Sequence, residues 1–348
     1  MGLLSFRNAE SEISNPEVFA TTWLAVSLVR EAVRPDPGNT MKKGNKVAAV
    51  LILVGVTAIA GVQIVRYRAR ADALAATAGF SGDRAFGDLR QLVAFGPRPP
   101  GSPALQRARE YISRQLSTAG ADTWNDTFVA TTPVGDILMT NVIGVLRGES
   151  PKLLILAGHY ETARLDGVHF VGANDGGSSA AFLLEMARVL GRRRNRLTYW
   201  LVFFDGEEVL KEWSARDSLY GSRHMAEQLE ADGQLKQIRA LVLVDMIADR
   251  HLHVLRESNS TPWLSDLVFE NARHLGYGRL FSGGRFPVED DHMPFLARGI
   301  PAVDIIDLTP FGSYHHTAQD SIDKCSPESL TVAGRVVLAT LAELVQIN

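Results

Sequence analysis

The sequence LTYWLVFFDGEEVLKEWSARDSLYGSRH, residues 197–224, decides how the rest of the chain is interpreted. Residues 197–204 are almost all apolar and rich in aromatic side chains, a pattern that predicts a strand buried on both faces of a sheet. Three acids and a glycine follow directly at 205–208 (DGEE). Adjacent carboxylates at the end of a buried strand repel one another and lose solvation. Either a bound cation or a solvated acidic turn would explain them.

The overall composition is that of an ordinary globular protein. The chain has 348 residues, 46% of them hydrophobic and 22% charged, with a net charge of −3. This length suits one large α/β domain or two smaller ones, and the near-neutral charge argues against binding to nucleic acid. The single cysteine, Cys325, excludes an intrachain disulfide and a thiolate zinc cluster.

An uncharged apolar run, VAAVLILVGVTAIAGVQIV at 47–65, is long enough to cross a bilayer. Basic residues flank it on both sides: Lys42, Lys43, Lys46, Arg66, Arg68 and Arg70. This is the layout of a secretory signal or a signal anchor, with Met41 as a candidate start. The length of the run and the arginines after it favour the anchor, although the small residues at 58–60 would permit cleavage.

We therefore divide the chain into four segments. They are a leader at 1–46, a transmembrane segment at 47–65, a stalk at 66–82 and a globular domain at 83–348; residues 1–40 of the leader would be mis-extended or dispensable if Met41 is the start. The domain would lie outside the cytoplasm, anchored to the membrane or secreted if the signal is cleaved. We expect a monomer.

Strand-like and helix-like patterns alternate along the globular domain. Strands are predicted at 128–146 (two, around a turn at 133–136), 151–158, 197–204, 241–244 and 300–306, and helices at 104–119 and 178–190. This alternation predicts an α/β fold with a mostly parallel sheet and helices on both faces. Functional sites in such sheets lie beyond the carboxyl ends of the strands.

Polar residues fall at those predicted strand ends or in the loops beside them: His159, Asp175, Glu207, Glu208 and Asp245. A catalytic zinc site needs three protein ligands and one open position. Asp175 and Glu208, together with a late histidine at His316, would supply that set. Glu207, next to a ligand, would then be free to act as a general acid and base.

Several short motifs resemble a known superfamily. GHYE (158–161), VGANDGG (171–177), FFDGEE (203–208), LVDMI (243–247) and HHT (315–317) are similar to the metal-binding framework of the M28 zinc aminopeptidases. WSARDSLYGSRH (213–224) and VEDDHMPFLARGIP (288–301) resemble, more specifically, the glutaminyl cyclases. The resemblance extends from about residue 80 to the C-terminus.

The resemblance implies an enzyme that converts the N-terminal glutamine of peptides or proteins to pyroglutamate and releases ammonia. It implies one Zn²⁺ per chain, held by Asp175, Glu208 and His316. Glu207 would transfer the proton, supported by an acidic network with Asp245 and Asp290. The glutamine pocket would be lined by Trp213, Phe311 and His315, the last replacing a tryptophan that is common in animal enzymes.

Two other functions remain open. His159, Asp175 and Asp245 could hold a second metal ion, which would make the chain a two-zinc aminopeptidase. A membrane-anchored binding domain on an inactive enzyme fold is the third alternative, although this chain keeps every expected ligand.

Overall fold

The computed structural model describes residues 77–347 apart from position 215, together with isolated positions at 55, 59, 61, 64 and 75. The chain divides into two compact units, Met1–Asp72 and Ala73–Asn348. The predicted leader and nearly all of the predicted transmembrane segment lie outside the described residues. In the described part of the chain, no helix combines the length and the apolar character needed to cross a bilayer. The predicted segment boundaries remain predictions.

A six-stranded mixed sheet forms the centre of the second unit, in the order β1-β2-β4-β3-β5-β8. Its strands are β1 (Asp122–Thr132), β2 (Gly135–Leu146), β3 (Ser150–His159), β4 (Leu197–Phe204), β5 (Ile238–Asp245) and β8 (Ala302–Ile306). Strands β4, β3, β5 and β8 run parallel to one another. Strands β1 and β2 form an antiparallel hairpin, and β2 also pairs antiparallel with β4. The predicted mostly parallel sheet is confirmed.

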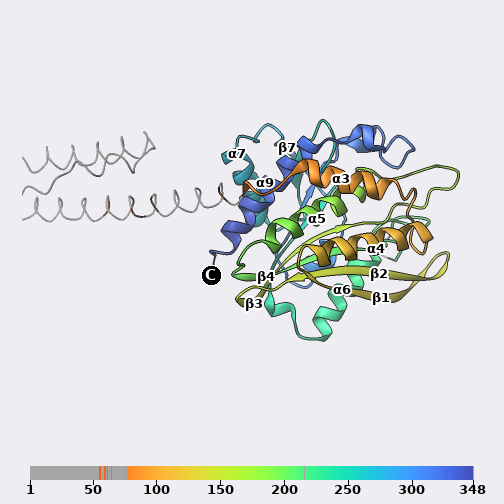
Figure 1. Cartoon of the computed structure of the whole chain (residues 1–348), viewed down its shortest axis with the longest axis horizontal. Helices are drawn as coiled ribbons and strands as arrows, with labels where there is room; N and C mark the ends of the chain where they lie inside the picture. Colours follow the sequence, from red (N-terminus) through yellow and green to blue (C-terminus); the bar gives the residue numbers. More distant parts are fainter. Residues whose placement is uncertain are drawn as a thin grey trace, which may run out of the picture. The chain divides into compact units, whose positions relative to one another are not determined.

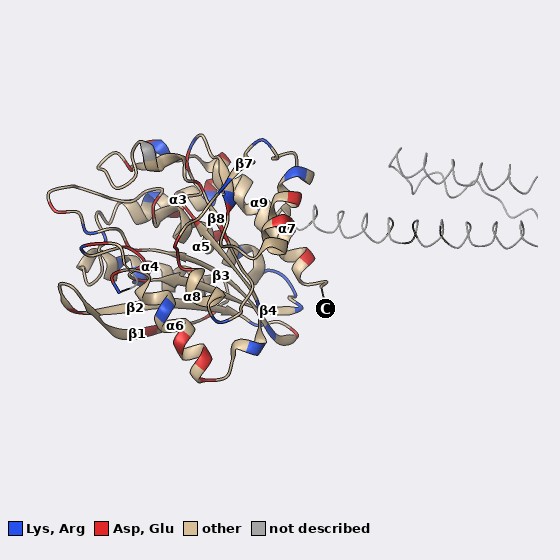
Figure 2. Cartoon of the chain, turned by 180° about the vertical axis from the view of Figure 1, so that it is seen from behind, with Lys and Arg blue, Asp and Glu red and all other residues tan. Residues whose placement is uncertain are grey.

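Helices cover both faces of this sheet (Figures 1 and 2). They are α3 (Gly82–Val93), α4 (Pro103–Thr118), α5 (Gly177–Gly191), α6 (Tyr220–Ala231), α7 (Pro262–His274), α8 (Met293–Leu296) and α9 (Pro327–Leu344). Three short 3₁₀ turns are η2 (Leu235–Gln237), η3 (Thr309–Gly312) and η4 (Ile322–Lys324). A small parallel pair, β6 (Val254–Glu257) and β7 (Phe281–Phe286), lies outside the main sheet.

The central strand β4 contributes to two hydrophobic cores, one on each face of the sheet. Leu201 and Phe203 belong to the larger core, which includes residues of α3, α4, α5, α7 and α9. Val202 and Phe204 belong to the smaller core, against α6 and α8. Complete burial of such side chains contributes roughly 1.5–3 kcal/mol each. The predicted strand, buried on both faces, is confirmed with the predicted bounds.

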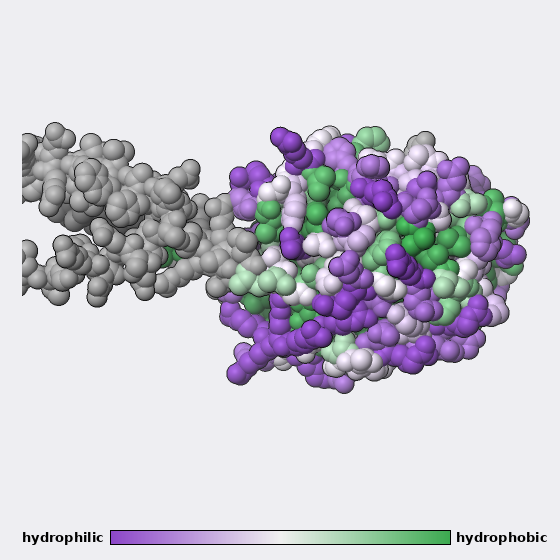
Figure 3. Space-filling view, turned by 45° about the horizontal axis from the view of Figure 1, so that its top comes forward, coloured by the Kyte–Doolittle hydropathy of each residue, from purple (hydrophilic) through white to green (hydrophobic). Residues whose placement is uncertain are grey.

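The face of the unit seen in Figure 3 is mostly hydrophilic, with apolar patches between the polar side chains.

Helix starts follow from local sequence. The hydroxyl of Ser102 accepts a hydrogen bond from the amide of Leu105 at 3.1 Å, and Pro103 occupies the first turn of α4. Ser326 and Pro327 repeat this arrangement at α9. Both pairs are favourable because the hydroxyl satisfies a free N–H and proline needs none.

Close packing of β3 against α5 positions the polar strand ends. A Cβ atom added at Gly158 would lie 2.6 Å from the Cβ of Ser179, so only glycine permits this approach. His159 follows as the last residue of β3, level with Phe204 of β4. The loop before α5 is thereby brought beside the carboxyl ends of three parallel strands.

Candidate active site

The predicted site residues gather at the carboxyl ends of β3, β4 and β5. His159 and Asp245 end β3 and β5, and the acidic turn at 205–208 follows β4. Asp175 lies just before α5, and His316 lies in the loop after η3. This is where the general rule for parallel sheets locates a functional site.

Two of the three predicted zinc ligands, Asp175 and Glu208, face the imidazole of the third, His316. Nε2 of His316 lies 2.9 Å from Oε1 of Glu208 and 3.3 Å from Oδ2 of Asp175. Both carboxylates are buried, and the imidazole is half-buried. His316 has a φ of +54°, a left-handed backbone conformation that costs a non-glycine residue of order 1–3 kcal/mol. The surrounding structure therefore forces this side chain towards the two acids.

These residues fit a zinc ion. Oδ2 of Asp175 is buried without a hydrogen-bond partner, whereas Oδ1 lies 3.2 Å from Nε2 of His159. Burial, and then the charge of Asp175, raises the pKa of Glu208 to about 7. Two buried carboxylates facing one imidazole nitrogen form the oxygen and nitrogen donor set that zinc takes, and a divalent cation would offset their repulsion.

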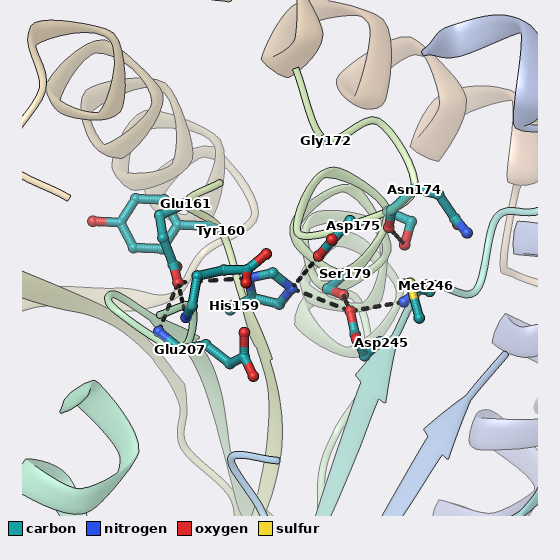
Figure 4. A network of polar contacts seen from close by, with 12 residues as sticks. His159, Tyr160, Glu161, Gly172, Asn174, Asp175, Ser179, Glu207, Asp245 and Met246 are labelled. Atoms are coloured by element: carbon teal, nitrogen blue, oxygen red, sulfur yellow. Dashed lines mark hydrogen bonds and ion pairs between the residues drawn. The ribbon is translucent and has the colours of Figure 1, made fainter. Parts of the chain in front are cut away.

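The His159 ring faces Asp175 and Asp245 with its Nε2 atom, and Glu161 and Glu207 lie on its opposite side (Figure 4). Its Nε2 atom is 3.1 Å from Oδ1 of Asp245. Burial opposes the charged imidazolium, but the carboxylates of Glu161, Asp175 and Asp245 outweigh that effect and raise the pKa of His159 well above its ordinary value. His159, Asp175 and Asp245 are also close enough together to hold an ion of their own.

Glu207 is the candidate acid and base. It is buried, and its backbone N–H donates to Oε1 of Glu161 at 2.6 Å, while the N–H of Glu208 donates to the same oxygen at 3.2 Å. Burial raises the pKa of Glu207 well above its ordinary value, and the charge of Glu208 raises it further. A carboxyl group with a raised pKa can both take and give a proton near neutral pH.

Asp290 lies within electrostatic reach of Glu207, and Asp245 lies within reach of Asp290; their roles in an acidic network remain predictions. Burial, and then the charge of Asp245, raises the pKa of Asp290 to about 6. Asp290 in turn raises the pKa of Glu207. The hydrogen-bond partners of Asp245 include the His159 imidazole and the backbone N–H of Met246, at 3.1 and 2.8 Å.

Two further buried acids, Asp291 and Asp304, were not predicted as site residues from the sequence. Burial raises the pKa of both Asp291 and Asp304 well above the ordinary value, and Asp290 is the next cause in each case. All four carboxylate oxygens of this pair are buried without a hydrogen-bond partner. An aspartate inside the apolar strand AVDII was the signal that could have identified Asp304.

The predicted pocket residues come from two loops. The Phe311 ring stacks on the His315 ring with centroids 4.0 Å apart, and His315 stacks on His316 at 3.7 Å. Trp213 donates from Nε1 to Oε2 of Glu289 at 3.1 Å, which connects its loop to the segment containing Asp290. Phe311 and Trp213 are 52% and 41% exposed, as side chains at the mouth of a site would be.

Comparisons with known proteins agree with this arrangement. The model of the family described as peptidase family M28 matches residues 141–341. The glutaminyl-peptide cyclotransferase-like protein of Bos taurus is 33% identical over 296 residues, which cover 73% of this chain and 73% of the relative. The glutaminyl-peptide cyclotransferase of Boiga irregularis is 32% identical over 289 residues, covering 72% and 78%.

Solved structures give the same result. The glutaminyl cyclase of an Acidobacteriales bacterium is 41% identical with a TM-score of 0.74, over 77% of this chain and 96% of that one. The glutaminyl cyclase of Porphyromonas gingivalis is 29% identical with a TM-score of 0.72, over 78% and 100%. The chain therefore belongs to peptidase family M28 and, within that superfamily, to the glutaminyl cyclases.

Replacing His316 by alanine tests the ligand set. We expect His316→Ala to weaken zinc binding about a hundredfold or more, since even outer partners of a metal site are worth 10–100-fold. Activity should be lost with the metal. Zinc per folded chain would be measured by mass spectrometry after dialysis, with His251→Ala, an exposed histidine, as the control. Equal zinc content in the two variants would show that His316 is not a ligand.

Proposed function

We propose that this chain is a zinc-dependent glutaminyl-peptide cyclotransferase, which converts N-terminal glutamine to pyroglutamate and releases ammonia. The observation that carries this proposal is the buried Glu207 carboxyl group. Its pKa is raised, and it is adjacent in sequence to a residue of the converging donor set. Relatives that are glutaminyl cyclases by name cover most of the domain and support the same activity.

The reaction needs one proton carrier. The α-amine nitrogen of the substrate bonds to the side-chain amide carbon, the bond from that carbon to the amide nitrogen breaks, and ammonia leaves. Glu207 would take a proton from the amine and deliver it to the departing nitrogen. Burial of Glu207, together with the charges of Glu208 and Asp290, raises its pKa, which favours the second transfer, in which Glu207 holds the proton.

We propose one zinc ion per chain, held by Asp175, Glu208 and His316. When bound, zinc would polarise the side-chain amide carbonyl of the substrate. Trp213, Phe311 and His315 would hold the glutamine side chain so that amine and amide stay within reach of each other. In a cyclisation this positioning supplies a large part of the rate acceleration.

The products of a glutamine-initiated dipeptide test the proposed reaction. We expect the purified protein to release ammonia from Gln-Ala and to leave a product whose peptide bond is intact, because the attack occurs on the side-chain amide. Ammonia would be followed by a coupled assay and the product by mass spectrometry. Ala-Ala, which has no side-chain amide, serves as the control substrate.

Release of free glutamine would instead support a two-zinc aminopeptidase. The observation that favours this second candidate is the group formed by His159, Asp175 and Asp245, which is compact enough for another ion. Similar solved structures include a Zn-dependent exopeptidase from Parabacteroides distasonis, 27% identical with a TM-score of 0.67, over 74% of this chain and 97% of that one. Two zinc ions per chain would accompany that result.

Glu207→Gln separates proton transfer from metal binding. The amide keeps the size of the side chain but cannot carry the proton, so we expect kcat to fall by about 10²–10⁴-fold while zinc remains bound. Glu212→Gln, an exposed position further along the same loop, should behave like the wild type. Loss of zinc from the Glu207 variant would identify Glu207 as a ligand and remove it as the proton carrier.

We propose that residues 47–65 anchor the enzyme in a membrane, with the catalytic domain on the extracytoplasmic side. The uncharged run and its basic flanks support this. We expect the native protein to stay with the membrane fraction after a high-salt wash and to begin at Met41 on N-terminal sequencing. A mature chain that contains residues 1–40 would contradict the start, and one that begins after residue 60 would contradict the anchor.

A further inference from the structure

Asp320 contacts the loop that carries Asp175, one of the proposed zinc ligands. Asp320 itself lies close in sequence to His316, another of them. Its Oδ1 atom accepts a hydrogen bond from the backbone N–H of Asn174 at 2.8 Å, and its Oδ2 atom accepts one from that of Asp175 at 3.1 Å. Asp320 is 1% exposed and follows His316 in the same loop. One buried carboxylate therefore joins the two loops that bring Asp175 and His316 together.

A second set of contacts repeats this connection. The side-chain amide of Asn174 donates to the Tyr314 hydroxyl at 3.1 Å, and that hydroxyl donates to Oδ2 of Asp249. The carbonyl oxygen of the same amide accepts from the backbone N–H of Ala248 at 2.9 Å. Asn174 thus ties the loop before α5 both to the segment of His316 and to the segment after β5.

Arg98 holds the same loop from its other end. Its side chain is completely buried, and its guanidinium donates to the carbonyl oxygens of Val171 and Gly172 at 2.8 and 3.2 Å. The loop from 171 to 175 therefore lies between a buried guanidinium that binds its carbonyl groups and a buried carboxyl group that binds its N–H groups. Burial, and then the charge of Asp175, raises the pKa of Asp320 to about 7, and the positive charge of Arg98 acts in the opposite direction and favours the ionised form.

We propose that Asp320 is a positioning residue of the zinc centre. It fixes the backbone of Asp175 so that the Oδ2 atom of Asp175 faces His316. This inference rests on the proposed zinc-dependent function. The N–H groups of Asn174 and Asp175 precede Gly176, the N-cap residue of α5, and so lie near the positive end of the helix dipole, where an anion is favoured. With both of them bound, the Asp175 side chain extends from a fixed point.

Asp320→Asn keeps the shape of the side chain but turns one of its two acceptors into a donor that would face a backbone N–H. The loop would lose a charged hydrogen bond and place two donors against each other. Residues that orient metal ligands are typically worth 10–100-fold in metal affinity. We expect zinc binding to weaken by about that factor, measured by competition with a chromogenic chelator on the full chain.

Two further readouts separate positioning from simple structural support. Cobalt(II) absorption reports the ligand geometry, and the melting temperature of the metal-free protein reports stability. We expect Asp320→Asn to change the cobalt spectrum. Asp323→Asn, an exposed aspartate on the next turn, should leave zinc affinity and spectrum as in the wild type. A variant that melts earlier but keeps wild-type zinc affinity and cobalt spectrum would overturn the proposal.

Tyr314→Phe provides a second test if Asp320→Asn does not fold. It removes the hydroxyl that connects Asn174 with Asp249 and keeps the ring, so we expect zinc binding to weaken by at least about fivefold, because loss of one hydrogen bond has that effect and this hydroxyl makes two. Unchanged affinity would overturn the role of this loop connection. Because zinc binding is measured directly, a wild-type protein that binds zinc but makes no pyroglutamate would contradict the proposed function alone.

Discussion

The burial of many carboxylates in one small region is the constraint on which the rest of the site depends. Asp175, Glu207, Glu208, Asp245 and Asp290 are each less than about a tenth exposed, at the end of strand β5 or in the loops beside the carboxyl ends of the parallel strands. Like charges in such surroundings repel and lose their hydration, so each ionised group needs a specific partner. The fold around the site is largely the set of those partners.

Backbone amides stabilise two further buried acids beside this group, Glu161 and Asp320. Glu161 accepts from the N–H groups of Glu207 and Glu208, and Asp320 accepts from those of Asn174 and Asp175. In each case a buried acid accepts hydrogen bonds from two backbone N–H groups of a segment that carries a candidate ligand. An N–H group in a loop has a fixed position, whereas a lysine side chain would lose entropy when held there. The hydrogen bonds that offset the burial of Glu161 and Asp320 therefore also fix the backbone of the segments that carry the candidate ligands.

Sequence alone was sufficient where a pattern is local. The strand at 197–204 was predicted with its bounds because all but one of its side chains are apolar or aromatic, and most of them are buried. The acids at strand ends could be grouped because parallel strands end at one edge. Arg98 lies in the loop between α3 and α4, and its burial depends on the carbonyl groups of Leu92, Val171 and Gly172 converging on one guanidinium. No local pattern encodes that convergence.

The turn at 205–208 explains why adjacent acids can have different roles. Gly206 has a φ of +74°, and a Cβ there would lie 2.5 Å from the sulfur of Met139. The carbonyl groups of Gly206 and Glu207 accept from the amides of Tyr220 and Leu219, at 2.7 and 2.9 Å. With the backbone fixed on both sides, Glu208 reaches His316, while Glu207 lies close to His159 and Glu161. The conformation of one tight turn thus separates the candidate ligand from the candidate base.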